Sequence, residues 1–415
     1  MEASWLETRW ARPLYLAFVF CLALGLLQAI KLYLRRQRLL RDLRLFPAPP
    51  THWFYGHQKF LQEDKMEKLE ETVEKYPCAF PCWVGPFQAF FFIYDPDYAK
   101  TFLSRTGKGL LNLEGPKWFQ HRRLLTPGFH CDILKTHVDV MVHSVNTMLA
   151  KWEKICCTQD TVVDVFEHIN LMALDIIMKC AFSQETNCQI NGTLDPYVKA
   201  TFEIGKIIFY RLYNFWYHHD IIFKFSPNGH RFQELSKVLH QHTGAAPSDS
   251  SRNDWGWGGD KEKRDQLSEM SYTTMCIMEM FRLIPPVPSI SRELSKPLTF
   301  PDGRSLPAGM TVVLSIWGLH HNPAVWKSPK IFDPLRFTKE NSDQRHPYAF
   351  LPFSSGPRNC IGQQFAMLEL KVAIALILLR FKVTPDLTRP PAFSDHIILK
   401  PKHGIHLHLK KFPVC

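Results

Sequence analysis

The chain has 415 residues, of which 46% are hydrophobic and 21% charged, and its net charge at pH 7 is +11. This composition supports one large buried core or two smaller ones, and it excludes disordered and collagen-like proteins. Eleven cysteines at irregular spacings in so long a chain indicate no disulfide framework, so we expect a reducing, cytosol-facing compartment.

An apolar stretch at residues 14–30 predicts a membrane-spanning helix. Only Gly25 and Gln28 interrupt it, and its continuation through Leu34 gives roughly 20 residues, enough to cross a bilayer once. The stretch is followed by one acidic residue, Asp42, and by six basic residues, namely Lys31, Arg35, Arg36, Arg38, Arg41 and Arg44. By the positive-inside rule this excess places the bulk of the chain in the cytosol, and it favours a membrane over nucleic acid as the partner. A cleaved signal peptide is the alternative, but there the positive charge would precede the apolar run.

The prolines at 47, 49 and 50 cannot continue a helix and divide the chain into an anchor with its basic flank, residues 1–46, and a soluble domain, residues 47–415. The soluble domain is predicted to be mainly α with a minor β part. A polar helical run predicts a helix at 63–75, and apolar residues at three- and four-residue spacing predict helices at 118–125, 134–155, 163–180, 197–217 and 231–242. Further helices are predicted at 267–282 and, from an apolar run, at 363–379. Aromatic or alternating segments predict strands at 87–94, around 298–316 and near the C-terminus. Residues 243–265 are rich in Gly, Ser and Trp, lack any apolar period and predict an aberrant junction.

The clearest chemical motif is a single cysteine in a glycine-punctuated turn directly before an apolar helix. It reads Phe353-Ser-Ser-Gly356-Pro-Arg358-Asn-Cys360-Ile-Gly362. Backbone N–H groups and the positive end of the helix dipole favour a thiolate at Cys360, and a thiolate is a soft axial ligand for iron. Gly356 permits a tight turn, Gly362 permits the close approach of a flat cofactor, and Arg358 can meet a carboxylate at its edge. The alternative is that Cys360 is a buried structural cysteine. This is disfavoured because five fixed motif positions would rarely occur together by chance.

This motif resembles the haem-binding loop of the cytochrome P450 superfamily, F-x-x-G-x-R-x-C-x-G. The resemblance implies the cytochrome P450 fold, haem b as cofactor and Cys360 as the axial metal ligand. It also implies cofactor contacts from the remaining motif positions, Phe353, Gly356, Arg358 and Gly362. Three residues outside the motif match family positions that bind the haem propionates, namely Trp118, Arg122 and Arg292.

A further resemblance is the family's ion-paired triad. Glu279-x-x-Arg282 matches the E-x-x-R helix, and Arg336 lies in Phe-Asp-Pro-Leu-Arg-Phe, which matches the segment that supplies the second arginine. Glu279 and Arg282 are one helical turn apart on one face, so a distant Arg336 can join them. For each arginine alone, a solvated surface charge is the alternative.

Finer details resemble family 4 of this superfamily, and most closely its subfamily X. They are the Pro-x-Pro-Pro link after the anchor, the run from His121 to His130, and the segment from His346 to Phe353. The resemblance implies a single-pass enzyme of the endoplasmic reticulum membrane with its haem domain in the cytosol. It also implies monooxygenation of fatty acids or related lipids, with electrons from NADPH-cytochrome P450 reductase.

The sequence departs from the family on the side where oxygen is activated. The family's oxygen-activating helix carries A-G-x-[DE]-T-[TS], but no such string occurs here, and residues 243–265 stand in its place. We therefore expect this helix to be missing and assign no catalytic residue, since the hydroxyl–acid pair that relays protons is not encoded. A second contraction falls at residues 105–108. Two further functions stay open: an inactive homologue that acts at most as a membrane-bound haem-binding or interaction protein, and a hydroperoxide-rearranging haem-thiolate protein.

Cys78 and Cys82 together with His218 and His219 suggest a zinc site as an alternative. No second close pair at finger spacing accompanies them, so ordinary packing is the preferred interpretation. The histidines near the C-terminus, His403 among them, alternate with apolar residues as on the polar face of a half-buried strand.

Overall fold

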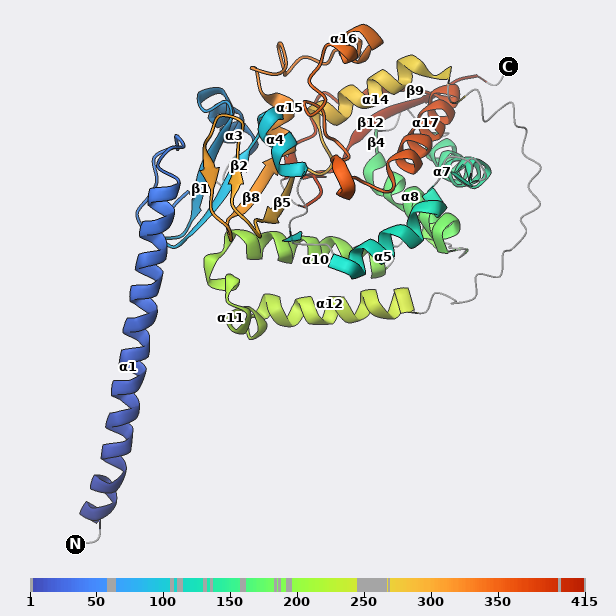
Figure 1. Ribbon diagram of the computed structural model, residues 1–415. Coiled ribbons are helices and arrows are strands. Elements are labelled where there is room, and N and C mark those ends of the chain that lie inside the picture. Colours follow the sequence, from blue (N-terminus) through green and yellow to red (C-terminus); the bar gives the residue numbers. More distant parts are fainter. Residues whose placement is uncertain are drawn as a thin grey trace.

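Figure 1 shows a computed structural model of the chain. It describes all residues except 1–2, 58–64, 105–107, 110–114, 130–132, 135–136, 157–161, 183–184, 186–187, 192–195, 245–266, 268, 395–396 and 414–415. The predicted junction at 243–265, apart from its first two residues, and most of the contraction at 105–108 therefore lie outside the described residues.

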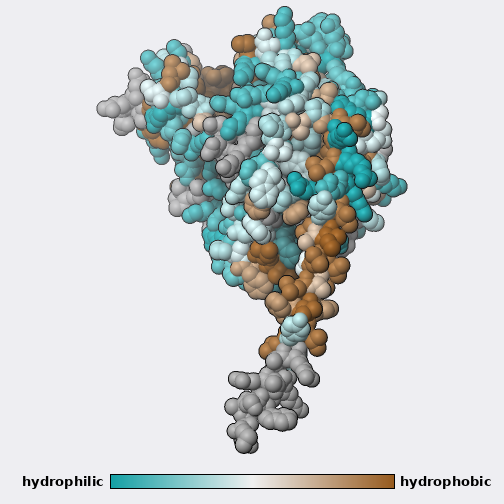
Figure 2. Space-filling view, turned by 90° about the vertical axis from the view of Figure 1, so that its left-hand side faces the viewer, coloured by the Kyte–Doolittle hydropathy of each residue, from teal (hydrophilic) through white to brown (hydrophobic). Residues whose placement is uncertain are grey.

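The N-terminal helix α1 (Ala3–Asp42) stands away from the globular body, with the N-terminus at its far end (Figure 1). Within it, 13–42 is the only part of the described chain that is long and apolar enough to cross a membrane by length and composition. Its apolar side chains are exposed, and Figure 2 shows hydrophobic surface along this helix and the adjoining end of the body. The helix extends beyond the predicted apolar stretch because the basic flank consists of good helix formers.

The segment after α1 is built into the globular core. Leu43 and Phe46 are only 4% exposed and pack into the larger of the two main apolar clusters. Tyr76 donates its hydroxyl hydrogen to the Ala48 carbonyl oxygen, and the His57 imidazole Nε2 lies 3.2 Å from the Pro49 carbonyl oxygen. These contacts tie the proline link to the body.

A five-stranded sheet lies beside this attachment point, in the strand order β1-β2-β8-β5-β3. The antiparallel hairpin of β1 (Ala79–Val84) and β2 (Gln88–Ile93) turns at Gly85, whose φ is +69°. β2 pairs in parallel with β8 (Thr311–Ser315), which pairs antiparallel with β5 (Ser289–Glu293), and β3 (Lys108–Gly109) forms the edge. Buried aromatic residues of β1 and β2 supply much of the surrounding core, in keeping with the aromatic segment predicted as a strand.

The second core is helical and surrounds the helix that follows the cysteine motif. That helix, α17 (Gln363–Arg380), contacts α7 (Val138–Cys156), which in turn contacts α8 (Val165–Phe182). Their shared cluster includes fully buried Met141, Leu149 and Trp152. A three-stranded sheet closes it, built from β4 (Val162–Asp164), β12 (His406–Lys411) and β9 (Phe381–Pro385).

The remaining helices cover the edges of these two cores. α10 (Pro196–Tyr213) and α12 (Pro227–Gly244) lie side by side and share a small apolar cluster (Figure 1). The other helices are α3 (Lys65–Lys75), α4 (Pro96–Leu103), α5 (Gly115–Leu125), α9 (Cys188–Asn191), α11 (Asp220–Lys224), α14 (Ser271–Leu283), α15 (Ile316–His321) and α16 (Lys339–Asp343). Short 3-10 helices are η1 (Thr126–Phe129), η2 (Phe215–His218), η3 (Pro334–Phe337) and η4 (Gly356–Arg358), and short strands are β6 (Leu298–Thr299), β7 (Ser305–Leu306), β10 (Phe393–Ser394) and β11 (Lys400–Pro401).

Most predicted elements are present, so the prediction of a mainly α domain with a minor β part is confirmed. α4 and α15 were not predicted. Both are short and depend on capping, since the Asp95 carboxylate accepts N–H bonds at the start of α4 and the Ser315 hydroxyl does so at the start of α15. His406 lies on the predicted strand β12, whereas His403 precedes it.

Candidate cofactor site

The cysteine motif folds into a closed loop that presents an exposed thiol. The Cys360 N–H donates to the Phe353 carbonyl oxygen at 2.9 Å, and the Asn359 N–H donates to the Gly356 carbonyl oxygen at 3.1 Å. Gly356 has a φ of +77°, and a Cβ built on it would lie 3.1 Å from the Leu103 carbonyl oxygen, so the turn requires glycine. The loop therefore holds the Cys360 thiol exposed to solvent, three residues before the first residue of α17.

The second motif glycine lies beside the sulfur. Gly362 caps the N-terminus of α17, and a Cβ built on it would lie 3.9 Å from the Cys360 Sγ. On the other side of the loop, the Phe353 ring meets the Phe281 ring of α14 edge-on, with centroids 5.3 Å apart. Cys360 thus lies just before the N-terminus of α17, in a loop whose first residue, Phe353, packs against α14.

A cationic edge forms next to this loop from three separate elements. The Arg358 guanidinium lies over the Trp118 ring of α5, 4.3 Å from its centroid. Arg292 of β5 is only 6% exposed, and its pKa is lowered from the ordinary value by burial and by the nearby Arg358 charge. The two guanidinium groups are close enough to repel each other, and that of Arg292 is largely desolvated. Together they favour the binding of anionic groups nearby.

Arg122, another of the predicted cofactor contacts, also lies at the loop. Its Nη1 donates to the Asn359 carbonyl oxygen and its Nη2 donates to the Asn359 Oδ1, both at 2.8 Å. The structure therefore brings all the predicted cofactor-binding residues together around Cys360, although it gives Arg122 protein oxygens as partners. Asn359 was not singled out in the sequence, and its only signal was its place between Arg358 and Cys360.

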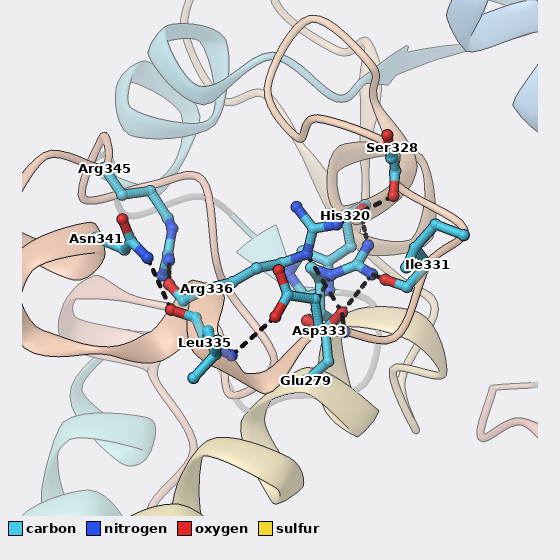
Figure 3. A network of polar contacts seen from close by, with 10 residues as sticks. Glu279, His320, Ser328, Ile331, Asp333, Leu335, Arg336, Asn341 and Arg345 are labelled. Atoms are coloured by element: carbon cyan, nitrogen blue, oxygen red, sulfur yellow. Dashed lines mark hydrogen bonds and ion pairs between the residues drawn. The ribbon is translucent and has the colours of Figure 1, made fainter.

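The predicted triad forms a separate buried network (Figure 3). Glu279 accepts from Arg282 Nε and Nη2, both at 2.7 Å, and both side chains are fully buried. Arg336 Nε lies 3.4 Å from Glu279 Oε1, and the Asp333 N–H donates to the same oxygen at 3.0 Å. The network holds η3 against α14.

One histidine joins this network to the cysteine loop. Arg282 Nη1 donates to the His320 carbonyl oxygen at 2.9 Å, and the Leu351 N–H donates to His320 Nε2, also at 2.9 Å. Leu351 lies two residues before Phe353. Burial lowers the pKa of His320 to about 3, so its imidazole is neutral and can accept through Nε2. No sequence signal pointed to His320, because its role depends on a contact with a residue 31 positions away.

These residues fit a haem. An exposed thiol with an open side can serve as an iron ligand, and the cationic edge of Arg292, Arg358 and Trp118 can hold the two carboxylates of a flat dianionic porphyrin. The residues match the chemistry of haem, because a soft sulfur donor can bind its iron and positive charge lies where its carboxylates would be.

The residues of the zinc alternative have other surroundings. Cys82 is buried in β1, and His218 has one ring nitrogen 2.6 Å from Gln88 Oε1 and the other 3.0 Å from the Leu212 carbonyl oxygen. Among the residues that the structure describes, no three His, Cys, Asp or Glu side chains cluster in a way that could hold a metal ion.

Comparisons of the chain with known proteins all point to the same family. The family model "Cytochrome P450" matches residues 47–248 and 258–408. The chain is 64% identical to Cytochrome P450 4X1 of Mus musculus and 61% identical to Cytochrome P450 4X1 of Homo sapiens, with both chains covered in full in each comparison. It is 42% identical to Cytochrome P450 4Z1 of Homo sapiens, again over the full length of both. Among solved structures, the heme domain of a cytochrome P450DA mutant is similar with a TM-score of 0.69 and 19% identity, covering 89% of this chain and 97% of that one.

The comparisons also contain an internal gap. The match to the Mus musculus relative extends over 507 positions while covering all 415 residues of this chain, so 92 positions have no residue here. The family match is interrupted at residues 249–257, inside the segment predicted as an aberrant junction.

Proposed function

The chain belongs to the cytochrome P450 monooxygenases, within family 4 and alongside the 4X proteins, and we propose that it acts on fatty acids or related lipids from a membrane. Proteins of this family use haem with a cysteine thiolate as axial ligand. The observation that carries the proposal is the closed loop that presents the Cys360 thiol beside a cationic edge. In this proposal Cys360 is the axial ligand of haem b.

Haem bound here supplies the activation of dioxygen, and the protein supplies a fixed sulfur donor and a fixed orientation. The Cys360 main chain is held by its hydrogen bond to Phe353, and Phe353 is held by Phe281. Arg292 and Arg358 would hold the haem carboxylates, and the Trp118 ring packs against the Arg358 guanidinium.

Glu279, Arg282 and Arg336 serve as the structural triad that supports this loop from behind. Their side chains are buried and joined by close polar contacts, and His320 connects them to the segment that leads into the loop. A buried network of close polar contacts fixes geometry more than it adds stability. We assign it no part in the chemistry.

The protein is proposed to span the endoplasmic reticulum membrane once, with residues 47–415 as a haem domain in the cytosol. The length of α1 and the six basic residues that follow its apolar part support this arrangement. Electrons would come from NADPH-cytochrome P450 reductase, which must reach the same side of the membrane. The burial of Leu43 and Phe46 keeps the body close to the membrane surface.

The oxygen-activating helix is proposed to be missing, with residues 243–265 joining α12 to α14. The absent A-G-x-[DE]-T-[TS] string, the interrupted family match and the 92 unmatched positions support this. The same observations favour a second candidate function, an inactive homologue that binds haem or a partner at the membrane. Without a hydroxyl–acid pair, proton delivery to bound oxygen lacks its usual donor.

Two measurements on the full-length protein separate these functions. The reduced, carbon monoxide-treated protein is expected to show the absorption band of thiolate-ligated haem, and Cys360→Ser is expected to abolish it. An unchanged band in that variant would overturn the ligand assignment. NADPH-driven oxidation of a fatty-acid panel with reductase then tests turnover: a thiolate band without product supports the inactive homologue, and turnover of added hydroperoxides alone supports the rearranging alternative.

A further inference from the structure

The end of α1 continues into the globular body through a hydrogen-bonded turn. The N–H groups of Leu43, Arg44 and Phe46 donate to carbonyl oxygens three or four residues earlier, so the turn runs on past Asp42. A flexible joint needs several residues whose backbone is free to rotate. These bonds leave little of the segment between Asp42 and Pro47 free to act as a hinge.

The body holds the Phe46 side chain between aromatic rings. The Phe46 ring meets the Phe91 ring of β2 edge-on with centroids 4.5 Å apart, and it meets the Phe300 ring at 6.3 Å. Phe300 directly follows β6, and its ring stacks on that of Tyr98 in α4 with centroids 3.8 Å apart. Elements far apart in sequence therefore surround one side chain of the segment that follows the anchor.

Arg304 closes this site on the side that faces solvent. Its guanidinium lies over the Phe46 ring, 4.9 Å from the centroid, and its side chain is 27% exposed. Asp302 holds that guanidinium by accepting from Nε at 2.8 Å and from Nη2 at 2.6 Å. A cation over an aromatic face attracts the ring. We call the site formed by Phe91, Phe300 and Arg304 the Phe46 socket.

Leu39 and Leu43 give the end of the helix a second attachment. Leu43 is buried, and Leu39 packs against the same apolar cluster that contains Phe46. The two leucines are four residues apart and share one face of the helix. Attachment both before and after the helix end fixes the direction of α1 relative to the body, and Figure 1 shows α1 leaving the body as one continuous helix.

We propose that Phe46, held in its socket by Arg304, makes the joint between anchor and body stiff, so that the body is held at one angle to the membrane. The proposal rests on the single membrane span proposed above for α1. A body held at one angle presents one face to the bilayer and keeps another accessible from the cytosol.

The test measures how freely α1 moves relative to the body in the full-length protein in lipid nanodiscs. Spin labels are attached to ketone-bearing amino acids at Gln37 of α1 and Lys75 of α3, two exposed positions, so that the native cysteines stay unlabelled. Pulsed electron–electron double resonance gives the distribution of distances between the labels. Amide hydrogen exchange over residues 36–50, in the protein without labels, measures the attachment of the segment itself.

Two pairs of variants are compared. Phe46→Ala empties the socket, and Leu45→Ala is its matched control, because Leu45 is adjacent in sequence and 68% exposed. Arg304→Gln removes the guanidinium from the ring face. Its control is Arg389→Gln, which removes a similar pair with Asp386 elsewhere in the body.

We expect a single narrow distance distribution in the parent protein. Phe46→Ala should broaden it about twofold or more and speed exchange about tenfold or more, because the segment loses its buried ring. Arg304→Gln should speed exchange about threefold, since a cation over a partly exposed ring stabilises it only modestly. Leu45→Ala and Arg389→Gln should match the parent protein in both measurements.

A broad distribution in the parent protein would overturn the proposal, because the anchor and the body would then move independently. A distribution as narrow in Phe46→Ala as in the parent would also overturn it, and so would equal broadening in Leu45→Ala, which would assign the stiffness to the turn and not to the ring.

Arg304→Gln changes the exposed rim of the socket, so it still tests the proposal if Phe46→Ala does not fold. Exchange as slow in Arg304→Gln as in Arg389→Gln would contradict the role of Arg304. Release of the parent protein from membranes by alkaline carbonate would show instead that α1 does not span a bilayer. That failure of the proposed membrane span is separate from the label distances, which are measured within one chain.

Discussion

His320 accepts a hydrogen bond of 2.9 Å from the main-chain N–H of Leu351, at the point where the chain turns toward the cysteine loop. The same histidine receives a bond from Arg282 at its carbonyl oxygen. One fully buried side chain thus couples the Glu279 network to the segment that carries Cys360, and this coupling gives rise to the first two predictions.

Replacing His320 by alanine should destabilise the protein by about 3 kcal/mol, because the Leu351 N–H is left buried without its acceptor and a cavity opens in place of the imidazole. The free energy of unfolding from urea titration of the full-length protein checks this. His403→Ala, at an exposed position near β12, is the control and should change stability by less than about 0.5 kcal/mol. A loss of similar size in both variants would contradict the coupling.

The pH dependence of stability should also depend on His320. Burial lowers its folded-state pKa to about 3, below the ordinary value of 6.5, so at intermediate pH the unfolded chain binds a proton that the folded chain does not. Stability should therefore be lost as the pH falls from 6.5 toward 3, by at most about 1.4 kcal/mol per pH unit from this group. Urea titrations at several pH values compare the parent protein with His320→Gln. Parallel curves for the two proteins would refute the assignment, because other histidines contribute equally to both.

Glu279→Gln should cost about 3 to 5 kcal/mol, since it leaves the fully buried Arg282 charge without its partner. The measurement is again the free energy of unfolding. Glu203→Gln is a matched control, because Glu203 makes a comparable pair with Arg231 at the exposed surface and should cost less than about 1 kcal/mol. A similar loss of unfolding free energy at the two sites would mean that burial does not make the Glu279–Arg282 pair more important for stability.

Gly356→Ala should destabilise the cysteine loop more than Gly303→Ala destabilises its own turn. Both glycines have positive φ, +77° and +85°, but a Cβ at Gly356 meets the Leu103 carbonyl oxygen at 3.1 Å and a Cβ at Gly303 meets nothing within 4 Å. The backbone penalty of about 1 kcal/mol is common to both, so the difference reports the close approach. Thermal unfolding and haem retention measure it. Equal effects would show that Leu103 moves away freely.

The sequence located the cysteine loop and the Glu279–Arg282 pair because their members follow one another at fixed short spacings, and it located Arg336 by a separate contiguous segment. Glu279 and Arg282 are paired as the helical spacing predicted, and Phe353 to Gly362 form one closed turn. No spacing in the sequence indicates which residues Arg122 contacts. Its two partners are oxygens of Asn359, far along the chain, and a spacing rule describes only neighbours.

The amino-acid sequence alone determined the N-terminal apolar helix, the mainly helical domain, the cysteine motif and the family, because each depends on local periodicity or on a contiguous motif. The tertiary structure decided that Arg122 contacts Asn359, that His320 links the triad to Leu351, and that Phe46 belongs to the core. The physical reason is that these roles arise from contacts between distant segments, whose directions are set by the packing of helices and sheet and not by the residues next to them.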